Sequence, residues 1–534
     1  MEGKNNEKGR PSRLAASPMQ MGKGDCEVTE STLLSLTSST NRLGLDVGRV
    51  CRSLVLLGVG ALIAAAYLPG SVSPDTIDIW DQAVTNVYTD WHSPVLAWLW
   101  GLSNFPIEAI FLLTLSVTIV AIDLILTRWL RPWIAVAGTS GVMMFPATVG
   151  WMGHVGKDMW FAAAFLLGTA LIARAGTENR VRLRRALMFG VLICFWCAIA
   201  ARKNALLPVG AALLVAWPVP KTIFGRLSAR PFLRRVLASV AVLVMLMGSV
   251  SAVSSLIVRP RATHPESSTY LFDLAAISLY EHRMLFPRGV LASGTTLSDI
   301  DRVFNVKQGD GYFFGAGTPV NPFPSPPQVT ALQQQWLAAV LAYPDAYLRT
   351  RISYSWALLG VSEPHPLGSV SDPGFSPSDM GRDLPLADRT FESLHQDVFN
   401  LLVKIEQRNL FRGWFFLLVL VVGSLAAGIR KVAEARVLLV GGVLSLASLA
   451  IAGISPTFRY SWFTALCALI VAALALQRIP GFGRADLPSG LDPRATNTAE
   501  GSAPMDPMVA AAGAARETDP VPEVQRVVRR PRQT

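Results

Sequence analysis

Charged residues are scarce in this chain. They make up 16% of its 534 residues, whereas soluble domains average about 25%. Hydrophobic residues account for 51% of the sequence. This composition argues against a water-soluble enzyme and indicates a protein of the membrane.

Cysteines are few, and the common nucleotide motifs are absent. The five cysteines are too few for a secreted disulfide scaffold and are not spaced as in a zinc module. Cys194 and Cys197 fall inside an apolar run, where we interpret them as helix packing rather than redox chemistry. The sequence has no P-loop, dinucleotide fingerprint, His-Glu-x-x-His or Gly-x-Ser-x-Gly motif. Chemistry on cytoplasmic ATP or nucleotide sugars therefore has no visible site.

Long apolar runs predict an all-α polytopic membrane protein with about ten transmembrane helices. A helix needs about 20 apolar residues to cross the roughly 30 Å of a bilayer core. The fifth and sixth runs are short and are separated only by a polar segment, so they form either two tilted helices or one re-entrant hairpin. The runs are 52–69, 107–127, 132–149, 159–175, 186–201, 204–219, 236–258, 411–429, 436–454 and 460–477.

The basic residues predict the orientation of these helices. The formal net charge is +11, but the lysines and arginines stand at the ends of apolar runs, which indicates membrane lipids and no nucleic acid as partners. When the basic N-terminal segment is placed inside, every strongly basic loop falls on the cytoplasmic face. This predicts a multi-pass protein of the plasma (inner) membrane with both termini cytoplasmic.

The same count divides the chain into tails, helix groups and one insertion. We expect disordered cytoplasmic tails, and within the insertion the stretches 329–342 and 346–359 show helical spacing. A cleavable signal peptide is not expected, because the first apolar run begins about fifty residues into the chain. The parts are a basic tail at 1–48, seven helices at 49–258 with an exterior loop at 70–106, an inserted extracytoplasmic α-rich domain at 259–410, three helices at 411–478, and a tail at 479–534.

Three acidic residues recur at the start of the exterior loop. Asp75, Asp78 and Asp81 are three residues apart, which on a helix places them along one face. Such a face is either the solvated side of an interfacial helix, or a source of one carboxylate that acts as a general base or binds a divalent cation. Asp75 is our candidate for this carboxylate. Pro74 restricts the backbone before it, and of the three acids it lies nearest the end of the first transmembrane helix.

Two further polar groups flank the next apolar runs. The Asp90-Trp91-His92 turn is either an aromatic-belt turn or part of a site, with His92 in a positional role. Lys157 and Asp158 begin the fourth apolar run. A charged pair at a helix start near the bilayer has two interpretations. In the first, Asp158 caps the helix and Lys157 extends to the membrane interface. In the second, Lys157 binds a phosphate while Asp158 orients it.

Cations on the predicted exterior face run against the usual charge bias. Arg202, Lys203 and Asn204 form a turn between two apolar runs, and Arg459 and Tyr460 stand at the head of the last run. Either these turns bind lipid headgroups, or the guanidinium and ammonium groups bind a phosphate.

Together these features resemble the membrane glycosyltransferases of the C-type fold (GT-C), which include the protein O-mannosyltransferases and the lipid A aminoarabinose transferases. More specifically, the chain is similar to bacterial multi-pass proteins that share a set of short motifs. The motifs are a Pro-Asp-Ser/Thr start at Pro74, an Asp-Trp-His turn at Asp90, an Arg-x-Asn turn at Arg202, and the stretches Phe272 to Ser278, Pro344 to Arg351 and Phe458 to Tyr460.

The resemblance implies a sugar donor on a polyprenyl phosphate and an envelope glycan or protein as acceptor, with inversion at the exterior surface. By position it implies Asp75 as general base, and Lys157, Arg202 and Arg459 as partners of the departing phosphate. Thr76 follows Asp75 where relatives commonly have a second acid, so use of Mg²⁺ or Mn²⁺ is left open. The supporting residues implied are Asp78, Asp81, Asp90, His92, Asp158, Asn204 and Tyr460.

Two other functions are compatible with these residues. A transporter or flippase for a lipid-linked or anionic substrate would line its path with the same cations, but it should place ionisable residues near the bilayer midplane, where the apolar runs offer little beyond Asp123. A non-catalytic scaffold would tolerate alanine at the charged turns.

Overall fold

The computed structural model describes residues 47–217, 231–307, 309–315, 317–361, 391–406 and 409–484. Within these ranges the regular elements are helices, and extended backbone pairs only in isolated bridges. Most of the two predicted tails lies outside the described residues. The beginning of the second predicted tail is ordered, because Arg131 N donates to the carbonyl of Phe482 at 3.1 Å.

The protein is a polytopic membrane protein, as predicted, but the number of ten spans is not confirmed. Seven helices of the described chain are long and apolar enough to cross a membrane, and a bent pair can form an eighth. They are α2 (Val47–Tyr67), α5 (Ile107–Leu126), α8 (Lys157–Ala175), α9 (Val181–Ala201), the span Phe232–Val258 built from α11 (Pro231–Ala252) and η4 (Val253–Val258), α19 (Ala433–Ala452), and α20 (Phe458–Ala475) with η7 (Leu476–Arg478).

The remaining predicted spans are not confirmed, for identifiable reasons. The run at 132–149 breaks at Pro146 into α6 (Pro132–Met143) and α7 (Pro146–Met152), which are bent by 66°. The run at 204–219 forms α10 (Leu206–Ala216), and the run at 411–429 forms α18 (Gly413–Ala427). At 1.5 Å per residue these two helices extend about 17 and 23 Å, short of a bilayer core of about 30 Å.

The predicted exterior loop 70–106 folds into two short helices, α3 (Pro74–Thr85) and α4 (Pro94–Ser103). Each begins with the same signal, a serine cap followed by proline at the first helical position. Each ends at an asparagine in the left-handed conformation, Asn86 for α3 and Asn104 for α4. In α3 the cap holds Asp75 in the first turn, where its carboxylate also complements the helix dipole.

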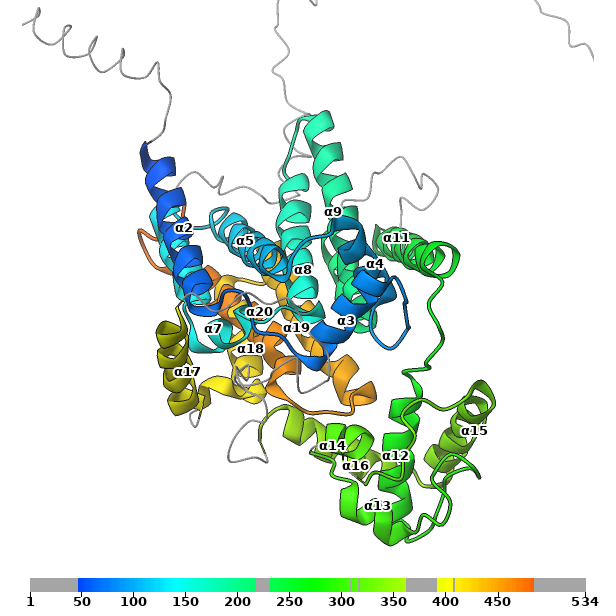
Figure 1. Ribbon diagram of the computed structural model, residues 1–534. Helices are drawn as coiled ribbons and strands as arrows, with labels where there is room; N and C mark the ends of the chain where they lie inside the picture. Colours follow the sequence, from blue (N-terminus) through cyan, green and yellow to red (C-terminus); the bar gives the residue numbers. More distant parts are fainter. Residues whose placement is uncertain are drawn as a thin grey trace, which may run out of the picture. The chain divides into compact units, whose positions relative to one another are not determined.

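The insertion after η4 is α-rich, as predicted. It contains α12 (Ser267–Tyr280), α13 (Leu297–Val303), α14 (Gly309–Phe314), α15 (Pro326–Ala342), α16 (Pro344–Leu358) and α17 (Glu392–Glu406). Helix α12 packs against α15 and α16, drawn in green in Figure 1. Their apolar core continues into Leu446 and Leu449 of α19. The insertion therefore shares a core with the membrane helices.

Candidate functional site

Five charged side chains from three helices and one turn alternate in sign, and we call them the charge cluster. Lys157 Nζ lies 3.0 Å from Asp75 Oδ2, and the Arg459 guanidinium bonds the same carboxylate oxygen. Arg459 Nε donates to Asp158 Oδ2, and Arg202 pairs with the second oxygen of Asp158. The structure thus brings together the candidate base and all three candidate phosphate ligands.

Backbone pairing between two loops explains why α3 and α8 meet here. Ser71 N donates to the carbonyl of Gly153, and Val155 N donates to that of Ser71, both at 2.9 Å. Thr76 adds a side-chain hydrogen bond to the carbonyl of Val155. Gly153 is required, because a Cβ there would lie 1.9 Å from the ring of Tyr67. This pairing places the first turns of α3 and α8 side by side, and with them Asp75 and Lys157.

His92 connects Lys157 to the acidic face of α3. Lys157 Nζ and His92 Nδ1 are 2.9 Å apart. An ammonium has only donors, so Nδ1 is the acceptor and Nε2 carries the proton of a neutral ring. Nε2 faces Asp75 Oδ1 and Asp78 Oδ2, each at 3.7 Å. Burial, together with the charge of Lys157, lowers the pKa of His92 to about 3, which keeps the ring neutral at physiological pH. The geometry gives His92 a positional role.

Asp75 is held in its ionised form. Burial raises the pKa of Asp75, but the charges of Arg459 and Lys157 outweigh it and hold that pKa well below its usual range. A carboxylate in this state is a weak proton acceptor for as long as both cations remain in contact with it. A role as general base therefore depends on something that draws Arg459 and Lys157 away.

The three supporting aspartates of the exterior loop have structural contacts. Asp78 Oδ2 accepts a hydrogen bond from Gln82 Nε2 at 2.6 Å, one helical turn along α3. Asp81 lies further along the same helix, where its carbonyl accepts from Thr85. Asp90 accepts from the backbone N and the hydroxyl of Thr263, at 2.5 and 2.6 Å. Asp90 thus fastens the exterior loop to the chain that follows η4.

Tyr460 and Asn204, two further supporting residues, have contacts close to Arg202. The Tyr460 ring lies beneath two guanidinium groups, with its centroid 5.4 Å from Arg202 Cζ and 5.6 Å from Arg459 Cζ. Asn204 Nδ2 approaches Ser448 Oγ of α19 at 3.5 Å. Stacking on Tyr460 fixes the direction of both guanidinium groups.

A cavity of about 1030 Å³ opens beside the charge cluster. Its lining includes the cluster residues Lys157 and Arg202, two further cations, Lys203 and Arg259, and one acid, Asp90. It also includes apolar residues of α9, α10 and the α11 span, among them Leu206, Met247 and Val250. Cations and apolar side chains therefore line the same cavity.

Arg259 was not identified as a candidate site residue from the sequence. It ends the α11 span in the left-handed conformation, with φ of 51°, and turns the chain into the insertion. The available signal was its place directly after an apolar run on the predicted exterior face, the same signal that marked Arg202.

A buried ion pair of the insertion positions the loop before Arg459. Arg351 Nη2 lies 2.7 Å from Asp273 Oδ1, and Trp336 Nε1 donates to Asp273 Oδ2 at 2.9 Å. Arg351 Nη1 also donates to the carbonyl of Gly453 at 2.7 Å. Gly453 follows α19 directly, so the pair fixes the start of the connection to α20.

The carboxylates of the charge cluster face cationic side chains. Within the described ranges, no group of three or more histidine, cysteine, aspartate or glutamate residues is placed to hold a metal ion. Mg²⁺ and Mn²⁺ prefer hard oxygen ligands, whereas the oxygens of Asp75 and Asp158 face guanidinium and ammonium groups. This donor set suits an anion on the cations better than a metal on the acids.

Comparison with known proteins returns only distant likenesses. No family model matches the chain, and no curated protein matches it. The oligosaccharyltransferase AglB from Archaeoglobus fulgidus, solved with an inhibitory peptide and a dolichol-phosphate, is 12% identical with a TM-score of 0.37, and the match covers 80% of this chain and 50% of AglB. ArnT from Cupriavidus metallidurans, solved with undecaprenyl phosphate, is 15% identical with a TM-score of 0.29. That match covers 80% of this chain and 77% of ArnT.

The chain spans about half the length of the oligosaccharyltransferase it matches. At these TM-scores the likeness does not assign an activity to this chain, and the function proposed below depends on the chain's own site.

Proposed function

We propose that this protein is a membrane glycosyltransferase that moves a sugar from a polyprenyl-phosphate donor to an extracytoplasmic envelope glycan or protein, with inversion. The observation that carries this proposal is that Lys157 and Arg202 of the charge cluster also line a cavity whose other lining residues are largely apolar. A polyprenyl phosphate likewise combines an anionic group with an apolar chain. The basic-loop count supports placing this site outside the cytoplasm, with both termini inside.

The donor binds in this cavity. Its phosphate meets Lys157 and Arg202, with Lys203 and Arg259 as further cations, while its first isoprene units lie against the apolar residues of α10 and the α11 span. A guanidinium binds phosphate oxygens with two parallel hydrogen bonds. The cations of the cavity therefore bind the phosphate of the donor in preference to its uncharged sugar.

The cations then assist the departure of the lipid phosphate. The acceptor oxygen forms a bond to the anomeric carbon while the bond from that carbon to the phosphate oxygen breaks, and the electron pair leaves with the lipid phosphate. Attack from the opposite face inverts the anomeric carbon. Each fixed donor aimed at the growing charge contributes about 3 kcal/mol of transition-state stabilisation.

Asp75 receives the proton of the acceptor hydroxyl once the donor is bound. The incoming phosphate competes with Asp75 for Lys157. It also competes with Asp158 for Arg202, and Asp158, once without Arg202, draws Arg459 away from Asp75. The hold of both cations on Asp75 weakens, and its pKa rises towards the usual value. Asp75 thus becomes a better base when the donor is in place. The same exchange of charges implies that the donor binds before the acceptor.

A transporter or flippase is the alternative function. It is favoured by one observation, the continuity of the cationic cavity with apolar helix surfaces. Against it, Asp123, the interior acid noted in the sequence, pairs with Arg52 and does not line this cavity.

Lipid binding tests the proposal. The purified chain is titrated with undecaprenyl phosphate and with the uncharged polyprenol of equal length. We expect tighter binding of the phosphate, with the difference reduced in Arg202→Ala and retained in Arg302→Ala, an exposed arginine of α13. Equal affinity for the phosphate and the alcohol would contradict a phosphate role for the cations.

A further inference from the structure

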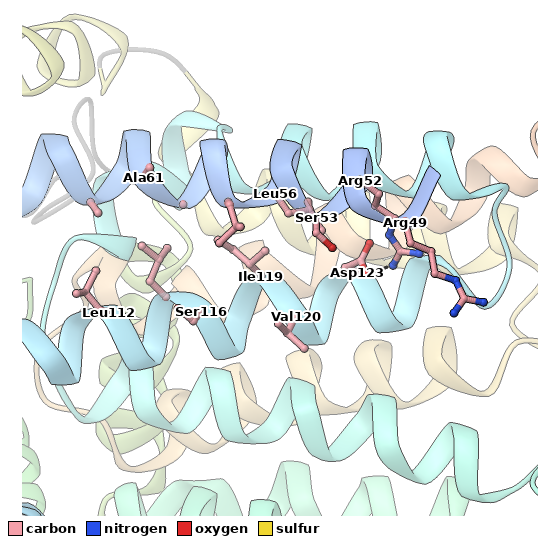
Figure 2. A pocket seen from close by; sticks show the side chains of 14 residues that line it. Arg49, Arg52, Ser53, Leu56, Ala61, Leu112, Ser116, Ile119, Val120 and Asp123 are labelled. Carbon is pink, nitrogen blue, oxygen red and sulfur yellow. Dashed lines mark hydrogen bonds and ion pairs between the residues drawn. The ribbon is translucent and has the colours of Figure 1, made fainter. Parts of the chain in front are cut away.

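A second cavity, of about 680 Å³, lies between α2 and α5, and its lining shares no residue with the charge cluster or the cavity beside it. Its walls are mainly apolar, with Leu56 and Ala61 on α2 facing Leu112 and Ile119 on α5 (Figure 2). We call this cavity the α2–α5 groove.

The groove runs along the part of α2 that is least buried. The buried residues of α2 all lie in its last five positions, from Ile63 to Tyr67. Nearer the other end, Arg52 pairs with Asp123 of α5, and the two side chains point towards one another in Figure 2. Between these positions, a Cβ at Gly60 would approach Ile119 Cδ1 to 3.3 Å, so a larger side chain at Gly60 would occupy the space beside α5.

One end of the groove is strongly basic. Arg49 and Arg52 line it directly, as Figure 2 shows. Two further arginines lie near this end, since Arg128 pairs with Glu434 and Arg484 Nη1 donates to the carbonyl of Thr127, four residues after Asp123. Asp123 pairs with Arg52. Among the described residues named here, the arginines therefore outnumber the acids.

We propose that the α2–α5 groove binds an anionic glycerophospholipid, with one acyl chain along the apolar walls and the phosphate beside Arg49 and Arg52. From Ser53 to Ala64 the groove runs about 17 Å at 1.5 Å per residue, which matches the roughly 15 Å of one bilayer leaflet. The basic end selects an anionic headgroup over a zwitterionic one, because arginines close to the membrane surface attract anionic lipids.

Binding of this lipid completes the packing of α2. The acyl chain fills the space between the exposed half of α2 and α5, so the lipid binds the folded protein and stabilises it. This site is separate from the proposed donor site and does not depend on the proposed function.

Photolabelling of the full chain in vesicles tests the site. Phosphatidylglycerol and phosphatidylcholine, each with a diazirine on the acyl chain, are compared, and labelled peptides are mapped by mass spectrometry. We expect phosphatidylglycerol to label 53–64 and 112–120 about fivefold more strongly than phosphatidylcholine. Equal labelling by the two lipids, or no labelling of these segments, would overturn the proposal.

Matched glycine variants distinguish the loss of space in the groove from a general disturbance of helix α2. Gly60→Leu fills the groove, whereas a side chain added at Gly58 meets nothing within 4 Å and leaves the groove open. Ser116→Leu fills the groove from α5 and provides a second steric block. We expect labelling to be lost in Gly60→Leu and Ser116→Leu, to fall about fivefold in Arg49→Gln, and to persist in Gly58→Leu. Full labelling of both blocked variants, or equal loss in Gly58→Leu, would contradict the proposed site.

Discussion

Arg459 bonds Asp75 across 384 positions of sequence. The same guanidinium bonds Asp158, so a single side chain from the last described membrane helix joins the first turns of α3 and α8. The site therefore exists only when the two ends of the described chain have come together, and it is a product of the whole fold.

Substitution of Asp75 by asparagine should abolish sugar transfer. The amide keeps the size of the side chain but cannot take the acceptor proton, and loss of a general base typically costs about 10²–10⁴-fold in rate. Initial rates with a purified polyprenyl-phosphate sugar check this result. Asp301→Asn, an exposed aspartate of α13, is the matched control and should retain full rate. A rate for Asp75→Asn equal to that of this control would refute the base assignment.

Removal of the Arg202 guanidinium should weaken donor binding more than acceptor binding. Arg202 lines the cavity that is proposed to bind the donor phosphate. The acceptor hydroxyl, by contrast, is assigned to Asp75. We expect KM for the donor to rise about tenfold or more in Arg202→Ala, in line with the loss of a charge-assisted hydrogen bond of about 1.5–3 kcal/mol. Steady-state kinetics with each substrate varied in turn measure the two effects, and an equal rise in both KM values counts against a phosphate role.

The stability of the protein should fall as the pH drops from about 6.5. Burial lowers the pKa of His92 to about 3 and that of His154 to about 4, so both rings stay neutral when folded but take up protons when unfolded. The unfolded state binds more protons in this window, so lowering the pH favours it. The depressed pKa of Asp75 adds a loss of stability only at lower pH, below the usual aspartate range.

Thermal unfolding of the detergent-purified chain from pH 7.5 to 4.5 measures this dependence. His92→Gln removes one titrating ring and should give a shallower fall in Tm than the unsubstituted chain. The same slope in both proteins would show that His92 is not buried in its neutral form.

Loss of Arg351 should destabilise the protein strongly. Its removal leaves Asp273 buried without its cation, which typically costs about 3–5 kcal/mol. Burial already raises the pKa of Asp273, and the charge of Arg351 opposes that rise. Arg349→Ala, two positions away on the exposed face of α16, should change Tm little. Chemical denaturation compares Arg351→Ala with Arg349→Ala, and similar midpoints would contradict the anchoring role of the buried pair.

The sequence predicted which residues meet, but not how they pair. Asp75, Lys157, Arg202 and Arg459 were singled out because each stands at an apolar run's end on one predicted face, and that local signal sufficed. The central place of Asp158, between Arg202 and Arg459, depends on three helices packing together and has no local signature. The recruitment of Arg259 into the cavity also depends on tertiary packing.

The predicted number of ten membrane spans is not confirmed, for a related reason. Hydropathy finds apolar runs, but whether a run spans the bilayer depends on where its helix ends. Pro146 splits one run into a bent pair, and α10 and α18 end after about 17 and 23 Å. Short helices of this kind persist because their neighbours cover them, as α19 covers α10 and α20 covers α18.

The fate of the bond between sugar and phosphate tests the central claim most directly. The chain is reconstituted in proteoliposomes with a radiolabelled polyprenyl-phosphate sugar and a mixture of envelope acceptors, and the lipid products are separated over time. The account predicts sugar-free polyprenyl phosphate and labelled acceptor with the unsubstituted chain, and neither with Asp75→Asn. Movement of the intact lipid-linked sugar between leaflets, with the bond unbroken, would contradict a transferase and establish the flippase instead.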